Sequence, residues 1–267
     1  MNERVLLAYS GTLASSAAVA WLLERRGADV VTVTLDVGQT ADLDEVRARA
    51  LTCGAMRAHV IDARDQFARD HVIPALRRDA APPLAALAHP LIARTLVDVA
   101  AIEAAGAVAH ASRGTAIDTA LDAIGAALPV IAPAREWRMD EADLIEDARA
   151  RHLPSGATPE SHLLIRRPID PAKAPEAPAV LAIAFEDGRP LSINGVTMAL
   201  QELIESLSLI GGQQGIGYGE DLPAPAAVIL RAAYAAAGGR NGTSRLKLHK
   251  GACVALAAPT PELVNLL

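Results

Sequence analysis

The stretch Val5-Leu6-Leu7-Ala8-Tyr9-Ser10-Gly11-Thr12-Leu13-Ala14-Ser15-Ser16 decides the fold of this chain. Its apolar start, Val5 to Ala8, is typical of a buried parallel strand. Ser10-Gly11 interrupts the run, and Ser15-Ser16 offers N-cap hydroxyls for a helix from Ala17 to Arg26. Backbone N–H groups and the positive end of the helix dipole would then face the turn, which predicts an anion site. Many α/β proteins open a first helix in this way and bind nothing, so a purely structural turn stays open.

The composition describes a protein with an aliphatic core. The chain has 267 residues, of which 51% are hydrophobic and only 3% aromatic, so Ala, Leu, Val and Ile must build that core. The formal net charge is −6 and the 25 Lys and Arg residues are dispersed, which argues against a nucleic-acid partner. No apolar run reaches the roughly 18 to 20 residues that span a bilayer, and no signal peptide is recognisable, so we expect a cytoplasmic protein without a membrane partner. Cys53 and Cys253 lie far apart without CxxC or paired-histidine spacing, which predicts buried thiols and no metal site.

Strands and helices alternate through the first 152 residues. Apolar or β-branched runs predict four further strands, at Asp29 to Asp36, Arg57 to Ile61, Ala107 to Ala111 and Leu128 to Pro133. Helices are expected between and after them, at Asp42 to Cys53, Asp65 to Arg78, His89 to Ala105 and Asp140 to Arg151. This alternation predicts an α/β fold with a Rossmann-like, five-stranded parallel sheet and helices on both of its faces.

A smaller α+β domain is expected beyond the parallel sheet. We predict a nucleotide-binding domain over residues 1–153, a linker over 154–178 and the second domain over 179–267. Strands at Val180 to Phe185 and Leu191 to Ile193 flank a hairpin turn at Glu186-Asp187-Gly188, and Asn194-Gly195 makes the next turn. The remaining expected elements are a helix from Ala199 to Leu209 stopped by Gly211-Gly212, a helix from Ala224 to Ala237 and a final strand pair from Thr243.

The first turn also resembles the pyrophosphate loop of the argininosuccinate synthase family, in the ATP-pyrophosphatase superfamily. The family writes this loop as Ala-Tyr-Ser-Gly-Gly-Leu-Asp-Thr-Ser, and here Thr12 replaces the second glycine and Ala14 the aspartate. Further similar blocks follow in order: Asp36-Val37-Gly38-Gln39, Pro90-Leu91-Ile92-Ala93, Arg135-Glu136-Trp137 and Arg245-Leu246-Lys247-Leu248-His249-Lys250-Gly251. The resemblance covers nearly the whole chain and identifies it as a shortened, divergent member.

This resemblance implies a bound nucleotide, ATP or AMP, together with magnesium that the nucleotide carries. By correspondence, the nucleotide-binding residues are Ala8, Tyr9, Ser10, Gly11, Ser15, Ser16, Thr34, Asp36, Gln39 and Gly114. Asp36 also ends a strand at the edge where open α/β sheets bind ligands, although a solvated strand-end aspartate explains it equally well.

The groups that hold citrulline and aspartate in the family are mostly missing here. The family's citrulline loop carries a tyrosine and a threonine, whereas the loop at Asp79 to Ala88 has no hydroxyl and is built mainly from Ala, Leu and Pro. Such side chains cannot hydrogen-bond a zwitterionic amino acid. In the next matching segment the family's lysine and arginine are replaced by Thr115 and Leu121, which removes two partners for carboxylate and phosphate.

Three residues of that segment are candidates for catalysis. His110 and Asp118 match the family pattern, and Arg113 restores one positive charge where the family has a threonine. His110 could act as a general base, but a histidine at the end of a strand is more often structural.

Three functions therefore remain open. In the family, citrulline attacks the α-phosphate of ATP, pyrophosphate leaves, and aspartate displaces AMP. This chain could be a pseudoenzyme that retains nucleotide binding, an AMP-forming ligase for another small and less polar substrate, or a synthase with rearranged ligands. Ala14 favours the first, because the pyrophosphate loop has lost its acid. The long C-terminal helix that ties the family's tetramer together has no counterpart, so we expect a homodimer through the smaller domain.

Overall fold

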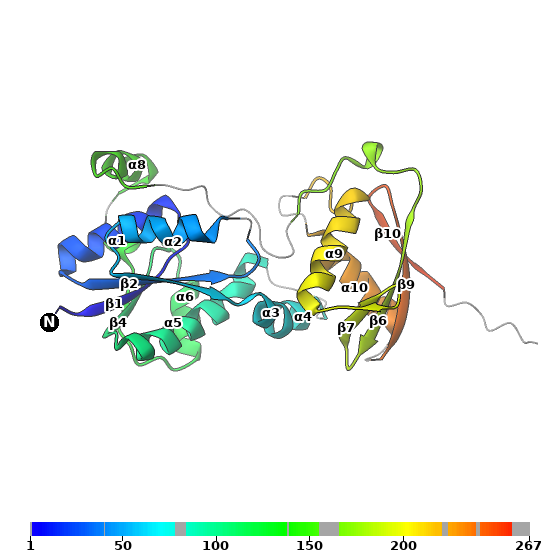
Figure 1. The fold of residues 1–267 in the computed structure, drawn as a ribbon, viewed down its shortest axis with the longest axis horizontal. Helices are drawn as coiled ribbons and strands as arrows, with labels where there is room; N and C mark the ends of the chain where they lie inside the picture. Colours follow the sequence, from blue (N-terminus) through cyan, green and yellow to red (C-terminus); the bar gives the residue numbers. More distant parts are fainter. Residues whose placement is uncertain are drawn as a thin grey trace, which may run out of the picture. The chain divides into compact units, whose positions relative to one another are not determined.

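The computed structural model describes residues 2–39, 41–77, 84–137, 139–154, 166–220, 224–238 and 241–257. The chain divides into two compact units, one of Met1–Phe67 with Pro82–His162 and one of Ala68–Ala81 with Leu163–Leu267. Each unit holds one five-stranded sheet (Figure 1). Much of the shortened loop at 79–88 and of the expected linker at 154–178 lies outside the described residues. No helix in the described ranges combines the length and the apolarity needed to cross a bilayer.

The first unit confirms the predicted α/β alternation. Its strands are β1 (Arg4–Ala8), β2 (Asp29–Asp36), β3 (Arg57–Asp62), β4 (Ala107–His110) and β5 (Val130–Ile131). Its helices are α1 (Leu13–Arg26), α2 (Leu43–Thr52), α3 (Arg64–Phe67), the 3-10 helix η2 (Leu84–Ala88), α5 (His89–Glu103), α6 (Ala116–Ala123), α7 (Pro133–Glu136) and α8 (Glu141–Ala150). The strand order is β3-β2-β1-β4-β5, and every neighbouring pair is parallel.

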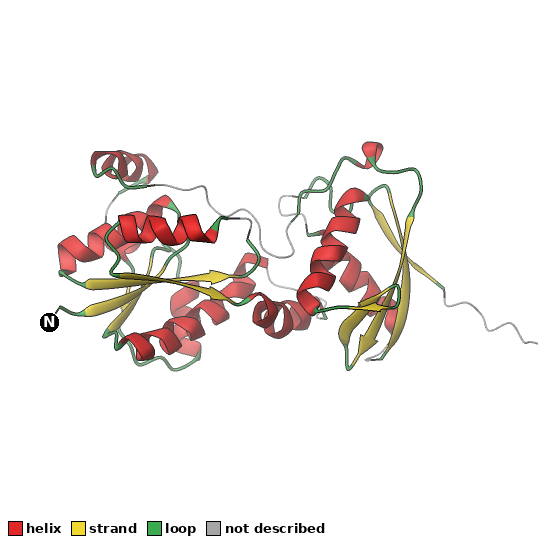
Figure 2. Ribbon diagram, viewed as in Figure 1, coloured by secondary structure: helices red, strands yellow, loops and turns green. Residues whose placement is uncertain are grey.

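Both faces of this sheet are buried, which explains why β1 is a continuous apolar run. Because side chains alternate along a strand, Val5 and Leu7 pack toward α1, α2 and α8, whereas Leu6 packs toward α5 and α6. All three side chains are fully buried. Figure 2 shows helices on each side of the parallel strands, as the sequence predicts.

The turn after β1 differs from its prediction. The expected cap at Ser15-Ser16 and helix start at Ala17 are wrong, because α1 begins at Leu13 and Thr12 is its N-cap. Thr12 has an extended backbone, with φ −73°, and its hydroxyl accepts from the Ser15 N–H at 3.4 Å. Gly11 turns the chain at φ +76°, so the strand passes into the helix four residues earlier than expected.

The helix expected from Asp65 to Arg78 is divided into three short pieces. Arg64–Phe67 (α3) is α-helical, Ala68–Val72 (η1) is π-helical, and Ile73–Leu76 (α4) is α-helical again. Pro74 lacks the N–H that would bond the carbonyl four residues earlier, and the wider π turn lies directly before it. The change from α3 to η1, between Phe67 and Ala68, is also the boundary between the two units.

The second unit carries an antiparallel sheet of order β10-β9-β6-β7-β8. Besides η1 and α4, its elements are η3 (Pro171–Lys173), β6 (Ala179–Glu186), β7 (Arg189–Ile193), β8 (Val196–Thr197), α9 (Leu200–Gln213), α10 (Pro225–Ala237), β9 (Gly242–His249) and β10 (Ala252–Leu256). Both predicted turns are present: Asp187-Gly188 and Asn194-Gly195 have positive φ at each residue, as tight hairpin turns require. Leu246 of β9 is fully buried on the side that α10 covers.

Gly211-Gly212 does not stop the preceding helix, contrary to the sequence prediction. The helix α9 continues through both glycines to Gln213. A Cβ on Gly211 would lie 2.8 Å from Ile229 Cδ1 and 2.8 Å from Pro225 Cβ, so the missing side chain permits close packing of α9 against α10. Gly211 therefore permits a close helix–helix contact. In the sequence, a glycine with this role looks the same as a glycine that ends a helix.

Candidate functional site

A cavity of about 380 Å³ opens at the carboxyl ends of β1, β2 and β4. β1 lies between β2 and β4, and the helices α1 and α5 that lead into these strands cover opposite faces of the sheet. This is the topological switch point at which open parallel sheets bind ligands. The described residues that line it are mostly apolar and include no Lys, Arg, Asp or Glu: Ala8, Tyr9, Ser10, Thr12, Ala14, Ser15, Val33, Thr34, Leu35, Val37, Gln39, Ala88, Ile92, His110, Ala111, Ser112 and Ile117.

Three hydroxyl groups gather at the N-terminus of α1 beside this cavity. Ser10 Oγ lies 3.1 Å from Thr12 Oγ1, and Thr12 Oγ1 lies 3.3 Å from Ser15 Oγ. Ser15 is buried and its hydroxyl donates to the Thr12 carbonyl at 2.9 Å, whereas Ser10 is exposed. Hydroxyls can donate to an anion, and the helix dipole adds positive potential at the same place.

Tyr9 links the turn after β1 to α1 and β2 through two hydrogen bonds. Its hydroxyl shares a 2.9 Å hydrogen bond with Ser16 Oγ, and its carbonyl accepts from Thr34 Oγ1 at 2.9 Å. Burial raises the pKa of the Tyr9 phenol to about 12, so the group stays protonated at neutral pH. Tyr9 and Thr34 therefore hold β1, β2 and α1 in register at the cavity wall.

Arg49 of α2 supports the turn from outside the cavity. Its Nη1 donates to the Gly11 carbonyl at 2.8 Å. A Cβ on Gly11 would lie 3.0 Å from Val46 Cγ2, so α2 packs directly on the turn. Arg49 lies in a charged amphipathic helix and carries no sequence signal that distinguishes it from its solvated neighbours, which is why sequence reasoning missed it.

Asp36 and Gln39 have different positions at the end of β2. Asp36 accepts from the Gly38 N–H at 2.9 Å and pairs with Arg64 Nε at 3.3 Å, and it does not line the cavity. Gln39 does line it, and its amide group folds back to donate to the Leu35 carbonyl at 2.7 Å and to accept from the Val37 N–H at 2.8 Å.

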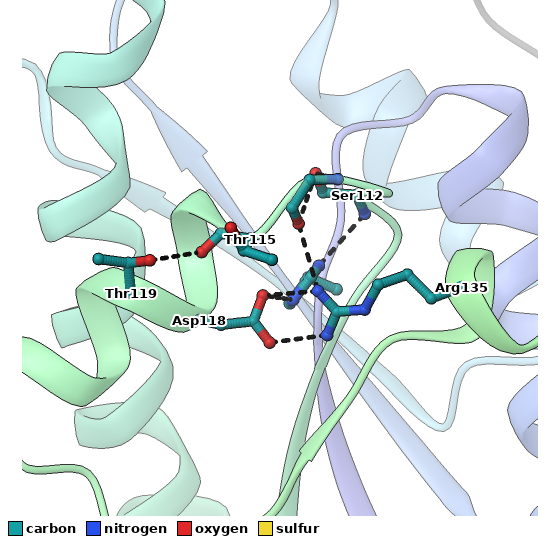
Figure 3. Close-up of polar contacts among 7 residues, drawn as sticks. Ser112, Thr115, Asp118, Thr119 and Arg135 are labelled. Atoms are coloured by element: carbon teal, nitrogen blue, oxygen red, sulfur yellow. Dashed lines mark hydrogen bonds and ion pairs between the residues drawn. The ribbon is translucent and has the colours of Figure 1, made fainter.

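His110, Asp118 and Arg135 form a hydrogen-bonded chain at the end of β4. Figure 3 shows the Asp118 carboxylate facing the Arg135 guanidinium. His110 Nε2 lies 3.1 Å from Asp118 Oδ2, and Arg135 holds both carboxylate oxygens, at 2.7 and 2.8 Å. Arg135 was not predicted as a site residue, although its Arg-Glu-Trp block was recognised. The sequence does not show that these residues meet, because Arg135 on α7 bonds Asp118 on α6, seventeen positions earlier.

The protonation states of His110 and Asp118 follow from burial of the imidazole and from the ion pair with Arg135. His110 is 1% exposed, and burial lowers the pKa of its imidazole. The Arg135 guanidinium lowers the pKa of Asp118 to about 2. The Ser112 N–H donates to His110 Nδ1 at 3.2 Å, so Nε2 carries the proton and donates to Asp118. Both nitrogens of the neutral ring are engaged, and in this arrangement the ring orients Asp118.

The predicted site residues separate into two groups. Those that line the cavity are Ala8, Tyr9, Ser10, Ser15, Thr34, Gln39 and His110. Those that do not are Gly11, Ser16, Asp36, Arg113, Gly114 and Asp118. Arg113 is exposed and donates to the Met139 carbonyl, and the Gly114 carbonyl accepts from Arg135 at 3.3 Å. The side chains of Arg113 and Arg135 therefore both donate hydrogen bonds to groups of the protein.

The sequence matches two family profiles. The argininosuccinate synthase N-terminal HUP domain matches residues 4–154, more than half of the chain, and the C-terminal domain of the same synthase matches residues 138–222. The chain belongs to the argininosuccinate synthase family. The family's HUP domain corresponds to the first unit and its switch-point cavity.

Curated relatives of the family support this assignment. Argininosuccinate synthase from Oceanobacillus iheyensis is 37% identical over 252 residues, which cover 81% of this chain and 60% of the relative. The enzymes from Geobacillus kaustophilus and Dictyoglomus thermophilum are 36% and 34% identical, over 81% of this chain and 62% and 63% of their own lengths. The chain thus spans about three fifths of the length of these synthases. Among solved structures, the U34-tRNA thiolase NcsA from Methanococcus maripaludis matches with a TM-score of 0.41 and 15% identity, over 59% of this chain and 60% of that one.

Proposed function

We propose that this member of the argininosuccinate synthase family binds an adenine nucleotide, ATP or AMP, in the cavity at the ends of β1, β2 and β4. The observation that carries the proposal is the hydroxyl cluster of Ser10, Thr12 and Ser15 at the N-terminus of α1, which lines a mostly apolar cavity. The hydroxyls and helix dipole suit phosphate oxygens, and apolar lining residues such as Leu35 and Val37 suit an adenine ring. Argininosuccinate synthases use ATP with magnesium, which agrees with this chemistry.

The described residues fit the nucleotide better than they fit a metal held by the protein. The lining residues that the structure describes include no carboxylate, and the described part of the chain contains no group of three or more His, Cys, Asp or Glu side chains that could ligate a metal. Magnesium prefers phosphate and carboxylate oxygens. We therefore assign magnesium to the phosphate groups of the nucleotide.

We further propose that this protein does not join citrulline to aspartate. Arg113 donates to the Met139 carbonyl and Arg135 to Asp118, and the described lining residues include no charged side chain in their place. A hydrogen bond to a charged group contributes about 1.5–3 kcal/mol. Loss of several such bonds weakens binding of these substrates by orders of magnitude, which supports a nucleotide-binding pseudoenzyme.

A second candidate is an AMP-forming ligase for a less polar substrate. Its support is the wall formed by Ala88, Ile92 and Ile117, which would bury an aliphatic or aromatic group beside the nucleotide. A synthase that uses citrulline through rearranged ligands is the third alternative, and the same assay tests it.

The decisive binding experiment is calorimetric titration with ATP and with AMP, each with and without magnesium. We expect saturable binding of both nucleotides. Ser10→Ala removes an exposed hydroxyl of the cluster and lowers the affinity about 2- to 10-fold, the effect of one hydrogen bond. Thr119→Ala is the matched control, since its exposed hydroxyl bonds the Thr115 carbonyl and does not line the cavity. No heat at millimolar nucleotide refutes the proposal.

A pyrophosphate-release assay then separates the alternatives. The pseudoenzyme predicts no release with citrulline and aspartate or with a panel of amino acids and small carboxylates. Release with citrulline establishes a synthase, and release with another compound establishes a ligase and names its substrate. Either release contradicts the pseudoenzyme assignment while leaving nucleotide binding intact.

We also propose that the protein is a cytoplasmic homodimer that associates through the antiparallel sheet. Its support is that apolar side chains are exposed toward both edges of this sheet, Leu191 and Val196 on β7 and β8 and Val254 on β10. Sedimentation at micromolar concentration checks the assembly, and a monomer or a tetramer would contradict it. Cell fractionation checks the compartment.

A further inference from the structure

The end of β2 has a backbone edge that β1 does not cover. The pairing of β1 with β2 ends where the Tyr9 N–H donates to the Val33 carbonyl at 2.9 Å, and the chain then turns into α1. Backbone groups alternate between the two edges of a strand, so the Leu35 carbonyl faces the same edge as the Val33 carbonyl. The Asp36 carbonyl faces the opposite edge, where it accepts from the Ala63 N–H at 2.9 Å.

The side chain of Gln39 occupies this edge. Its Nε2 donates to the Leu35 carbonyl at 2.7 Å, and its Oε1 accepts from the Val37 N–H at 2.8 Å. These two backbone partners fix which atom of the amide is the nitrogen and which is the oxygen. Gly38, at φ +89°, turns the chain back toward the end of its own strand. Leu35, Val37 and Gln39 all line the switch-point cavity.

A primary amide and the amino edge of adenine present the same pair of groups. Adenine carries its N6 amino donor next to a ring nitrogen acceptor, and primary amides bond this edge through two hydrogen bonds. The amide of Gln39 likewise carries a donor next to an acceptor. The backbone acceptor at Leu35 and the backbone donor at Val37 therefore match adenine as well as they match Gln39. The Val37 N–H is a single donor and serves one of them at a time.

We propose that Gln39 is an internal competitor for the base: its amide occupies the Leu35 and Val37 backbone groups in the free protein and leaves them when the amino edge of adenine binds. This role rests on the nucleotide site proposed above. Gln39 then lowers the affinity, because only the fraction of the chain in which it has moved away binds the base. It also raises specificity, because a base without an amino group cannot replace both of its hydrogen bonds.

The first test compares calorimetric titrations of wild type, Gln39→Ala and Gln39→Met with AMP. Both variants remove the amide, and methionine keeps the length of the side chain. Each variant binds AMP about 2- to 10-fold more tightly than wild type, the effect of one competing hydrogen bond. The same gain is expected with adenosine, which lacks the phosphate. Gln201→Ala is the matched control and binds AMP like wild type, since Gln201 bonds Glu205 within α9 of the second unit.

The second test observes Gln39 directly. In a nitrogen-15 NMR spectrum of the full chain, its side-chain amide signals are assigned by their absence from the spectrum of Gln39→Ala. Saturating AMP shifts these signals toward the positions of a glutamine amide in water. Purine riboside 5′-monophosphate lacks only the 6-amino group of AMP. It binds wild type about 2- to 10-fold more weakly than AMP, because it offers one hydrogen bond in place of two.

Failure of this role for Gln39 is distinguishable from failure of nucleotide binding. If AMP binds wild type while the Gln39 amide signals stay in place, Gln39 does not compete with the base, although the nucleotide site stands. The same conclusion follows if both Gln39 variants bind AMP no more tightly than wild type, or if wild type binds the two monophosphates equally. If neither wild type nor the variants bind AMP, the nucleotide site and the role of Gln39 are both refuted.

Discussion

Gly11 is the residue on which the turn between β1 and α1 depends. Its φ of +76° is unfavourable for any residue with a Cβ, and a Cβ would also lie 3.0 Å from Val46 Cγ2 and 3.1 Å from Arg49 Nη1. We predict that Gly11→Ala lowers the free energy of unfolding by about 2–4 kcal/mol, from the left-handed backbone and crowding together. Urea unfolding measures this loss.

Gly27 at the other end of α1 provides the matched control. Its φ is +59°, but an added Cβ would meet nothing within 4 Å. Gly27→Ala therefore carries the backbone cost alone, about 1–2 kcal/mol. Equal losses in free energy of unfolding for the two variants would show that crowding between α2 and the turn adds nothing to the cost of Gly11→Ala.

His110 makes the stability of the first unit depend on pH. Burial lowers the pKa of its imidazole below the ordinary value of about 6.5. The unfolded chain therefore takes up this proton at higher pH than the folded chain. The stabilisation from neutral His110 is fully present above about pH 6.5 and is lost as the pH falls toward the lower folded value.

The corresponding prediction compares wild type with His110→Asn. The advantage of wild type in free energy of unfolding shrinks as the pH falls from about 6.5 to 5.5, by at most about 1.4 kcal/mol per pH unit. Asp118, with its pKa of about 2, stays ionised throughout this range and does not contribute. Urea titrations at several pH values measure the difference, and a constant or growing advantage contradicts the assignment.

At the scale of elements, the contact between α9 and α10 depends on one glycine of an adjacent pair. Alanine is the better helix former by about 1 kcal/mol, but a Cβ at Gly211 would lie 2.8 Å from Ile229 Cδ1 and from the rigid ring of Pro225. We predict that Gly211→Ala destabilises the second unit by about 1–3 kcal/mol through overpacking. Thermal or urea unfolding reports the loss.

Gly212→Ala tests the same helix without the crowding. A Cβ there would meet the flexible Arg166 side chain at 3.4 Å, close to ordinary contact. This variant leaves stability unchanged or raises it by up to about 1 kcal/mol, as the helix propensity of alanine requires. A loss equal to that of Gly211→Ala would exclude the packing explanation.

At the scale of the whole molecule, the two units should respond differently to nucleotide. Ligand binding stabilises the folded state by about 2.7 kcal/mol at a concentration one hundred times the Kd. We predict that AMP slows hydrogen exchange in β1, α1 and β4 and leaves β6 and β9 unaffected, because the cavity is built within the first unit. Equal protection of the antiparallel sheet would contradict this location of the nucleotide.

Local sequence determined most of the elements. The second strand was predicted at Asp29 to Asp36 and lies there, since β-branched residues and flanking turns are local signals. Asp187-Gly188 and Asn194-Gly195 likewise specified their turns through the conformations that these residues tolerate. The alternation of strands and helices predicts that the strands pair in parallel, and they do.

Tertiary structure alone decided which residues meet. Arg135 bonds Asp118 and Arg49 bonds Gly11, although these residues come from segments far apart in the chain. The same holds for Gly211, whose role depends on side chains of another helix, and for Ala68–Ala81, which belongs to the second unit. A propensity or a turn is fixed by neighbours along the backbone, whereas a cavity, an ion pair or an unpaired donor exists only when packed elements bring distant side chains together.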